Sequence, residues 1–147
     1  MPISTKSASL AQVLDDLTAE GASELTEHLP DKALKCFACG HRCLIKEGKR
    51  GICKVRFNEG GKLLVPMNYV AALASDPTEK KPFFHVLPGS DTLTFGMLGC
   101  DLHCGYCQNW LTSQALRDDS AGTSPTIVTS DRLVSMAKAY GADMVGS

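Results

Sequence analysis

Seven cysteines, divided into two groups along the chain, constrain this sequence more than any other feature. Four lie within residues 36–53, and three lie close together at Cys100, Cys104 and Cys107. An odd total argues against a framework in which every cysteine is paired in a disulfide. A division into four and three instead suits two metal sites in a reducing compartment. We therefore expect a cytoplasmic protein that contains two groups of metal-binding thiols.

The second group has the spacing C-x3-C-x2-C, with Tyr106 directly before its last cysteine. Three thiolates can bind three irons of a [4Fe–4S] cube, whereas cubes that only transfer electrons ordinarily use four. The fourth iron is then open to another ligand, so the pattern favours chemistry over electron storage alone. Gly99 and Gly105 allow the backbone to bend tightly around a bulky cluster. Zinc fits this group less well, because no fourth ligand follows the triplet and His103 lies inside its tight loop.

The residues around this triplet resemble the signature of the radical S-adenosylmethionine (radical SAM) superfamily. Residues 105–109 are similar to the activating enzymes of glycyl radical enzymes, and a wider stretch is similar to the AmmeMemoRadiSam-system radical SAM enzymes. The resemblance covers roughly residues 34–147, and its matching segments outside the triplet are residues 36–39, 51–53, 76–82 and 85–90. The first thirty or so residues contribute nothing to it.

The resemblance implies two cofactors, a [4Fe–4S] cluster and SAM. In the superfamily, SAM chelates the open iron, and one electron from the reduced cube cleaves SAM to methionine and a 5′-deoxyadenosyl radical. We therefore expect an electron donor such as a flavodoxin or ferredoxin, and hydrogen abstraction from an unidentified protein, peptide or small molecule. Two alternatives are kept: an activating enzyme that installs a glycyl radical on a partner protein, and a non-catalytic zinc or iron–sulfur module.

Three residues beside the triplet are the predicted cofactor-binding residues. Tyr106 matches the aromatic position that lies beside the SAM adenine in the superfamily, and packing of the loop is its alternative role. Gln108 and Asn109 are placed to hydrogen-bond near the cluster sulfurs, which would tune the cluster potential. The same two side chains could instead cap the short helix that follows.

The first group contains Cys36, Cys39, Cys43 and Cys53. Four thiolates can close a tetrahedral zinc site with no open position, which is a structural arrangement. The same tetrahedral sulfur set also suits an iron–sulfur cluster, so the spacing leaves zinc and iron–sulfur open. His41 is an alternative ligand for one of the cysteines. A module of about thirty residues needs such a staple, because its hydrophobic core is too small to hold it folded.

Four segments are expected along the chain: an N-terminal helical segment over residues 1–33, the cysteine-rich module over 34–66, a connector over 67–91, and the start of a barrel over 92–147. The first contains an amphipathic helix over residues 10–25, with Gly21 as an alternative end, that begins with a capping box of Ser9 and Gln12. In the module, residues 52–57 and 62–65 read as a hairpin with Cys53 on one arm. Prolines make the connector irregular. The resemblance implies that Lys81 or His85 of this connector contacts the substrate or the SAM carboxylate.

From residue 92 the pattern becomes strand, loop, helix and strand, which is typical of a parallel α/β unit. The first strand covers residues 92–97, and residues 112–129 form a loop. The helix covers residues 131–140, with an N-cap at Thr129 or Ser130. Gly141 ends this helix, and a second strand follows. The resemblance implies a partial (β/α) barrel with chemistry at the carboxyl ends of its strands. Because a six-unit barrel needs about 200 residues, we expect an N-terminal fragment of that fold, inactive by itself.

Composition excludes several kinds of partner. The chain of 147 residues has a net charge of −1, and no basic stripe indicates a nucleic-acid surface. No run of eighteen apolar residues predicts a transmembrane helix, and the N-terminus lacks the apolar core of an export signal. We expect neither a nucleic acid nor a membrane as a partner.

Overall fold

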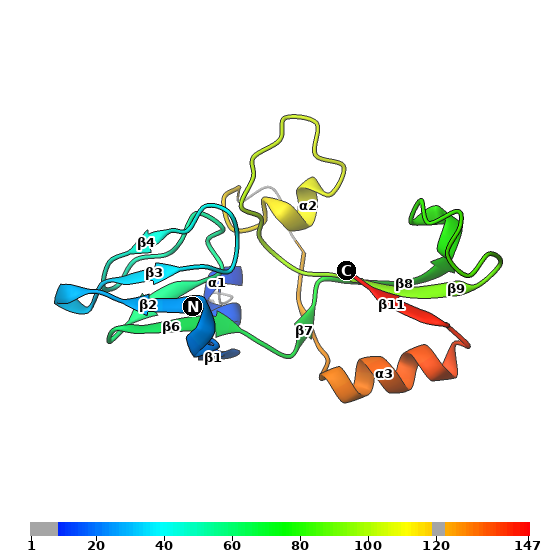
Figure 1. The fold of residues 1–147 in the computed structure, drawn as a ribbon, viewed down its shortest axis with the longest axis horizontal. Helices are drawn as coiled ribbons and strands as arrows, with labels where there is room; N and C mark the ends of the chain where they lie inside the picture. The colour runs from blue at the N-terminus through cyan, green and yellow to red at the C-terminus, as the bar shows by residue number, and fades with distance from the viewer. Residues whose placement is uncertain (1–8, 119–122) are drawn as a thin grey trace, which may run out of the picture. The chain divides into compact units, whose positions relative to one another are not determined.

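A computed structural model describes residues 9–118 and 123–147, and these fall into two compact units (Figure 1). Unit one contains residues 9–67 and 99–118, and unit two contains residues 68–98 and 123–147. Both cysteine groups therefore belong to unit one. This division differs from the four consecutive segments expected from the sequence, because the triplet loop falls in the same unit as the cysteine-rich module.

Unit one is built mainly from two small antiparallel sheets. The first has the strand order β1-β6-β5 and the second has the order β2-β3-β4. The strands are β1 (Thr18–Glu20), β2 (Thr26–His28), β3 (Leu34–Cys36), β4 (Leu44–Ile45), β5 (Phe57–Glu59) and β6 (Lys62–Pro66). The helical elements are α1 (Leu10–Asp15), α2 (Trp110–Ser113) and the 3-10 turns η1 (Ser23–Leu25) and η2 (Pro30–Lys32).

The N-terminal helix is shorter than its periodicity predicts. Its capping box is confirmed, since the Ser9 hydroxyl accepts from the Gln12 N–H and the Gln12 side chain accepts from the Ser9 N–H. The helix ends at Asp15, however, and the expected extension to residue 25 is wrong. Residues 18–20 form β1 and pair with β6 instead. Pairing with a strand more than forty residues away therefore overrides the local helical pattern.

The hairpin in the cysteine-rich module is confirmed, but its first arm is shorter than expected. Gly60 and Gly61 join β5 to β6, and both have positive φ angles (65° and 82°), as a two-residue hairpin turn requires. The first arm begins only at Phe57. Residues 51–56 form a tight turn that is closed by the Gly51 N–H donating to the Arg56 carbonyl. Cys53 therefore lies in a turn and not on a strand.

A small hydrophobic core holds unit one together. Its buried members are Leu34, Cys36, Ile45 and Leu63, with Ala38 and Cys43 packed against them. The fully buried Asn58 lies beside this core, and its Nδ2 donates to the carbonyls of Ile45 and Lys32. Two cysteines of the first group are thus part of the packing around which the module forms.

Unit two contains a three-stranded sheet with the order β11-β9-β8 and a short pair of β7 and β10. Its elements are β7 (Tyr69–Val70), β8 (Ala72–Pro77), η3 (Thr78–Lys80), β9 (Asp91–Gly96), β10 (Thr126–Ile127), α3 (Ser130–Ala139) and β11 (Met144–Gly146). The expectation of an irregular connector over residues 67–91 is wrong for its first half, because β8 pairs with β9 along its whole length, whereas residues 81–90 contain no helix or strand. The prolines end strands at Pro66 and Pro77 and do not interrupt them.

The strand, helix and strand expected from residue 92 are confirmed. β9 and β11 are parallel, with Met144 opposite Thr92, and α3 precedes β11 in the chain. The Thr129 hydroxyl caps α3, and Gly141, at a φ of 69°, ends the helix in a Schellman motif. The expected loop over 112–129 also contains the end of α2 and the short β10. The barrel itself stays a prediction.

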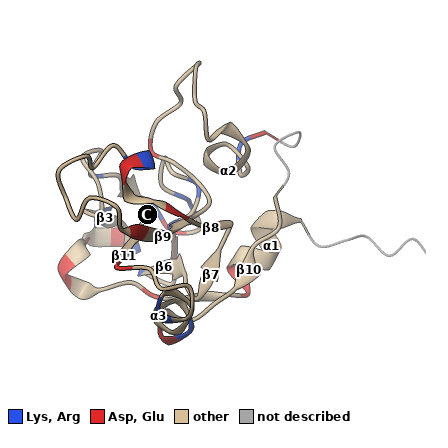
Figure 2. Cartoon of the chain, turned by 90° about the vertical axis from the view of Figure 1, so that its right-hand side faces the viewer, with Lys and Arg blue, Asp and Glu red and all other residues tan. Residues whose placement is uncertain are grey.

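Across residues 9–118 and 123–147, no helix is both long enough and apolar enough to cross a lipid bilayer. Both signs of charge are interspersed over the ribbon, and α3 carries acidic and basic residues together (Figure 2).

Candidate metal centre

The triplet loop enters unit one at Gly99, and the structure permits only glycine there. Its φ is +83°, and its N–H donates to the Thr112 carbonyl at 3.1 Å. A Cβ at this position would lie 2.2 Å from Cγ2 of Val55 and 2.8 Å from the Cys53 carbonyl oxygen. The backbone that leads into the triplet thus packs directly on the turn that carries Cys53. Gly105 differs, because a Cβ there would meet nothing within 4 Å.

The three triplet cysteines form no disulfide, and they differ in solvent exposure. Cys104 is exposed, whereas Cys100 and Cys107 are partly buried. The Cys100 sulfur accepts from the Leu102 N–H at 3.4 Å, and the Cys107 sulfur lies 3.2 Å from the Ser113 hydroxyl. The first and last cysteines of the triplet are therefore held by polar contacts to residues of the loop and of α2.

The number and type of ligands fit a cluster bound by three thiolates, although the three sulfurs do not lie close together around one point. Within residues 9–118 and 123–147, no three Cys, His, Asp or Glu side chains come together closely enough to hold a metal ion. Three free thiols lie within eight residues of one loop, and its middle cysteine is exposed.

The predicted cofactor-binding residues beside the triplet are all exposed. The Tyr106 side chain is 92 % exposed, so it does not pack the loop. Asn109 occupies the N-cap position of α2, but its side chain makes no capping hydrogen bond. Gln108 is exposed as well. Packing for Tyr106 and capping for Asn109 are therefore absent, and contacts of all three with SAM or the cluster stay predictions.

Backbone pairing brings part of the first cysteine group together. The Cys36 N–H donates to the Cys43 carbonyl at 2.9 Å, which continues the ladder between β3 and β4. A Cβ built on Gly51 would lie 3.8 Å from the Cys43 sulfur, so the turn that carries Cys53 approaches the same place. Cys39 belongs to a tight turn in which its carbonyl accepts from the Arg42 N–H. All four thiols are free, and Cys36 is buried.

His41, the alternative ligand for the first group, lies near the triplet. Its Nε2 is 4.0 Å from Oδ2 of Asp101, and both side chains are a little over one-third exposed. The Cys100 thiol in turn lies 3.7 Å from Oδ1 of Asp101. This histidine therefore extends from the first cysteine group toward the second.

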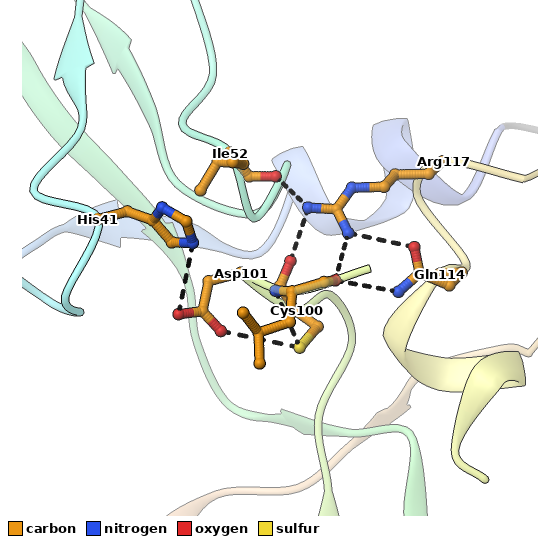
Figure 3. A network of polar contacts seen from close by, with 7 residues as sticks. His41, Ile52, Cys100, Asp101, Gln114 and Arg117 are labelled. Atoms are coloured by element: carbon orange, nitrogen blue, oxygen red, sulfur yellow. Dashed lines mark hydrogen bonds and ion pairs between the residues drawn. The ribbon is translucent and has the colours of Figure 1, made fainter. Parts of the chain in front are cut away.

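Arg117 is the main residue of this region that the sequence did not reveal (Figure 3). Its guanidinium lies among backbone carbonyls of the triplet loop and of the turn before Cys53, and Gln114 lies beside it. Hydrogen bonds to backbone carbonyls require no particular partner side chain. Because any residue type supplies a backbone carbonyl, no sequence pattern predicts these hydrogen bonds of Arg117.

The segment over residues 76–82 has a structural role inside unit two. Lys80 and Lys81 donate to the Asp76 carboxylate at 2.7 and 3.0 Å, and these hydrogen bonds, first from Lys80 and then from Lys81, lower the Asp76 pKa. The Gly89 N–H donates to Glu79 and lowers its pKa. Lys81 is thus engaged within its own unit, while His85 is exposed. Their predicted contact with substrate or SAM stays a prediction.

Comparison with known proteins gives one relative and no function. The chain is 43% identical over 94 residues to the uncharacterized protein MJ0808 of Methanocaldococcus jannaschii. The match covers 63% of this chain but only 28% of that protein. No protein-family model and no solved structure matches the chain.

Proposed function

We propose that this chain is part of a radical SAM enzyme whose triplet Cys100, Cys104 and Cys107 binds a [4Fe–4S] cluster with one open iron. The observation that carries the proposal is the set of three free thiols on one loop, with its entry fixed at Gly99 and its middle thiol exposed. When bound, the cluster and SAM supply the 5′-deoxyadenosyl radical that abstracts hydrogen from a protein, peptide or small-molecule substrate.

Some residues of the triplet loop would fix its conformation, and others would contact the cluster or SAM. Cys100 and Cys107 are partly buried and hydrogen-bonded, so they fix the two ends of the triplet. Cys104 and Tyr106 are exposed, which leaves the middle thiol free to move and the aromatic ring free to stack on the SAM adenine. Gln108 and Asn109 also have exposed side chains with which to contact the cluster or SAM.

The first group supplies a second, structural metal site in this proposal. The four thiols would hold zinc or an iron–sulfur cluster, since both accept a tetrahedral set of sulfurs. Cys36 and Cys43 are already paired through their backbones, and both pack in or against the core of unit one. A metal at this place would therefore stabilise the module and take no part in the reaction.

Anaerobic reconstitution of the full-length protein with iron and sulfide tests the cluster. We expect a brown protein, an electron paramagnetic resonance (EPR) signal that changes when SAM is added after reduction, and release of 5′-deoxyadenosine. Cys104→Ser should lose the signal, while His103→Ala, a neighbouring change outside the ligand set, should retain it. A colourless protein that contains only zinc would instead support the non-catalytic module and reject the proposal.

Two further measurements separate the remaining alternatives. Substitution of Cys36 and Cys39 with serine, followed by counting iron and zinc per chain, identifies the second metal, and unchanged counts would remove the second site. Deuterium transfer from labelled candidate substrates into 5′-deoxyadenosine identifies the substrate class. Transfer from a glycine of a partner protein would show that the enzyme installs a glycyl radical.

A further inference from the structure

We infer that Arg117 is a positioning residue that holds the triplet loop against the turn carrying Cys53, so that the two cysteine groups move as one body. The inference concerns contacts within unit one, and only its consequence for the cluster rests on the proposed function. Nothing in the C-x3-C-x2-C spacing requires such a residue.

The Arg117 guanidinium meets backbone from both cysteine groups (Figure 3). Its Nη2 donates to the Cys100 carbonyl at 2.8 Å and to the Ile52 carbonyl, directly before Cys53. Its Nη1 donates to the Leu102 carbonyl at 2.8 Å. A planar guanidinium presents its donors in a fixed fork, so a single side chain can bind several carbonyls at once.

Gln114 extends this arrangement to the last cysteine of the triplet. Its side chain is buried, and its Oε1 accepts from Nη1 of Arg117 at 3.1 Å. Its Nε2 donates to the Leu102 carbonyl at 3.3 Å and to the Ser113 hydroxyl at 3.2 Å. The same hydroxyl lies 3.2 Å from the Cys107 sulfur. A continuous series of hydrogen bonds therefore runs from the carbonyl before Cys53 to Cys107.

The close approach of Gly99 to the same turn is a second and independent observation. The Cys53 carbonyl and the Val55 side chain occupy the place that a Cβ on Gly99 would need. The triplet loop thus contacts the turn directly at Gly99, and Arg117 links it to the turn again by donating to the carbonyls of Cys100, Leu102 and Ile52. The direct contact at Gly99 and the bridge through Arg117 together restrict the Cys100 backbone more than either would alone.

This arrangement couples the two groups energetically. Ligand binding that fixes the Cys53 turn also fixes the carbonyl of Ile52, to which Arg117 donates. Arg117 then holds Cys100 in the geometry that this turn sets. Because coupling between two binding sites is reciprocal, filling the triplet should also favour metal binding by the first group.

Thiol alkylation of the reduced, metal-free, full-length protein tests the inference without any cofactor. The variants are Arg117→Lys, which keeps the charge but loses the fork, and Arg117→Gln, which loses both. Alkylation of Cys53 and Cys100, followed by mass spectrometry, should become about tenfold faster in both variants, because local opening becomes easier. Arg132→Lys, on α3 in unit two, is the matched control and should leave both rates unchanged. Wild-type rates in Arg117→Lys would overturn the inference.

Gln114→Ala provides a second variant in case both Arg117 variants fail to fold, which circular dichroism would reveal. It removes the hydrogen bonds to Arg117, Leu102 and Ser113 but leaves the guanidinium, so we expect a smaller increase of about threefold at Cys100. Faster alkylation of Cys107 alone would show that Gln114 acts only through its hydrogen bond to Ser113. That result would overturn the inference that Gln114 supports Arg117 in holding Cys100.

Reconstitution with iron and sulfide then separates this inference from the proposed function. Arg117→Lys should bind less iron per chain than wild type and should give a broadened EPR signal. If wild type binds no iron, the proposed function fails while the alkylation result still decides the role of Arg117. If wild type and Arg117→Lys bind equal iron with the same signal, the coupling inference fails and the proposed function stands.

Discussion

Gly99→Ala should destabilise unit one by about 2–5 kcal/mol, and the contributions follow from the local geometry. An alanine at a φ of +83° occupies the left-handed region, which costs about 1–2 kcal/mol for a residue with a Cβ. The new methyl would also lie 2.2 Å from Val55 and 2.8 Å from the Cys53 carbonyl, well inside the 3.4 Å of ordinary contact. Overpacking of this kind adds about 1–3 kcal/mol.

Two other glycines of unit one separate these contributions. Gly48 has a φ of +68° with open space around its Cβ position, so Gly48→Ala should cost about 1 kcal/mol through the backbone alone. Gly105 has open space and no positive φ, so Gly105→Ala should change stability by no more than about 0.5 kcal/mol. The expected order of destabilisation is therefore Gly99, then Gly48, then Gly105.

Urea unfolding followed by tryptophan fluorescence measures this series. The chain has a single tryptophan, Trp110, and it lies in α2 of unit one, so its emission reports on this unit. The midpoint should fall most for Gly99→Ala, with the slope unchanged if the transition stays two-state. A midpoint for Gly99→Ala equal to that of Gly48→Ala would show that the Cys53 turn does not pack against the triplet loop, and the reasoning would be refuted.

Three further predictions test other elements. Asn58→Ala should cost about 2–3 kcal/mol in the same unfolding assay, because it leaves the buried Ile45 carbonyl without its side-chain donor; no loss would mean that the side chain is not buried in solution. Thr129→Ala should cost about 1 kcal/mol at α3, measured by hydrogen exchange, while Ser130→Ala should cost less. The Asp76 pKa is lowered in the folded chain, so its stabilising contribution is present above the ordinary value of 3.8 and is lost as pH falls through the lower folded value. Asp76→Asn should therefore reduce the loss of hydrogen-exchange protection at β8 and β9 on acidification, and an unchanged acid dependence would contradict the ion pairs.

The sequence predicted those features that a few neighbouring residues determine. The capping box at Ser9, the Gly60–Gly61 turn and the Thr129 cap each depend on contacts within about four residues, and all are present. The Schellman end at Gly141 belongs to the same class. Such motifs satisfy backbone groups locally, so the residue types alone indicate them.

Features that depend on distant partners were missed. Residues 18–20 look helical, yet they become β1 because β6 offers an unpaired strand edge. β8 was hidden because the prolines around it suggested an irregular segment, whereas Pro77 stands at the strand end. The contacts of Arg117 were missed because their acceptors are backbone carbonyls up to 65 residues away in the chain.

The cysteine-rich module has to be understood as part of the support of the triplet. The sequence separates residues 34–66 from the proposed cluster loop by some thirty residues, which form strands of unit two. The chain nevertheless returns to the module at Gly99, where the Cys53 carbonyl leaves no room for a side chain. Arg117 then ties the next residues of the loop to the same turn. In the proposed enzyme, a loop whose middle cysteine is exposed would need such an anchor, because three ligands restrain a cluster less than four. If the four cysteines of the module bind a metal as proposed, that metal would fix the turn against which the triplet loop is held.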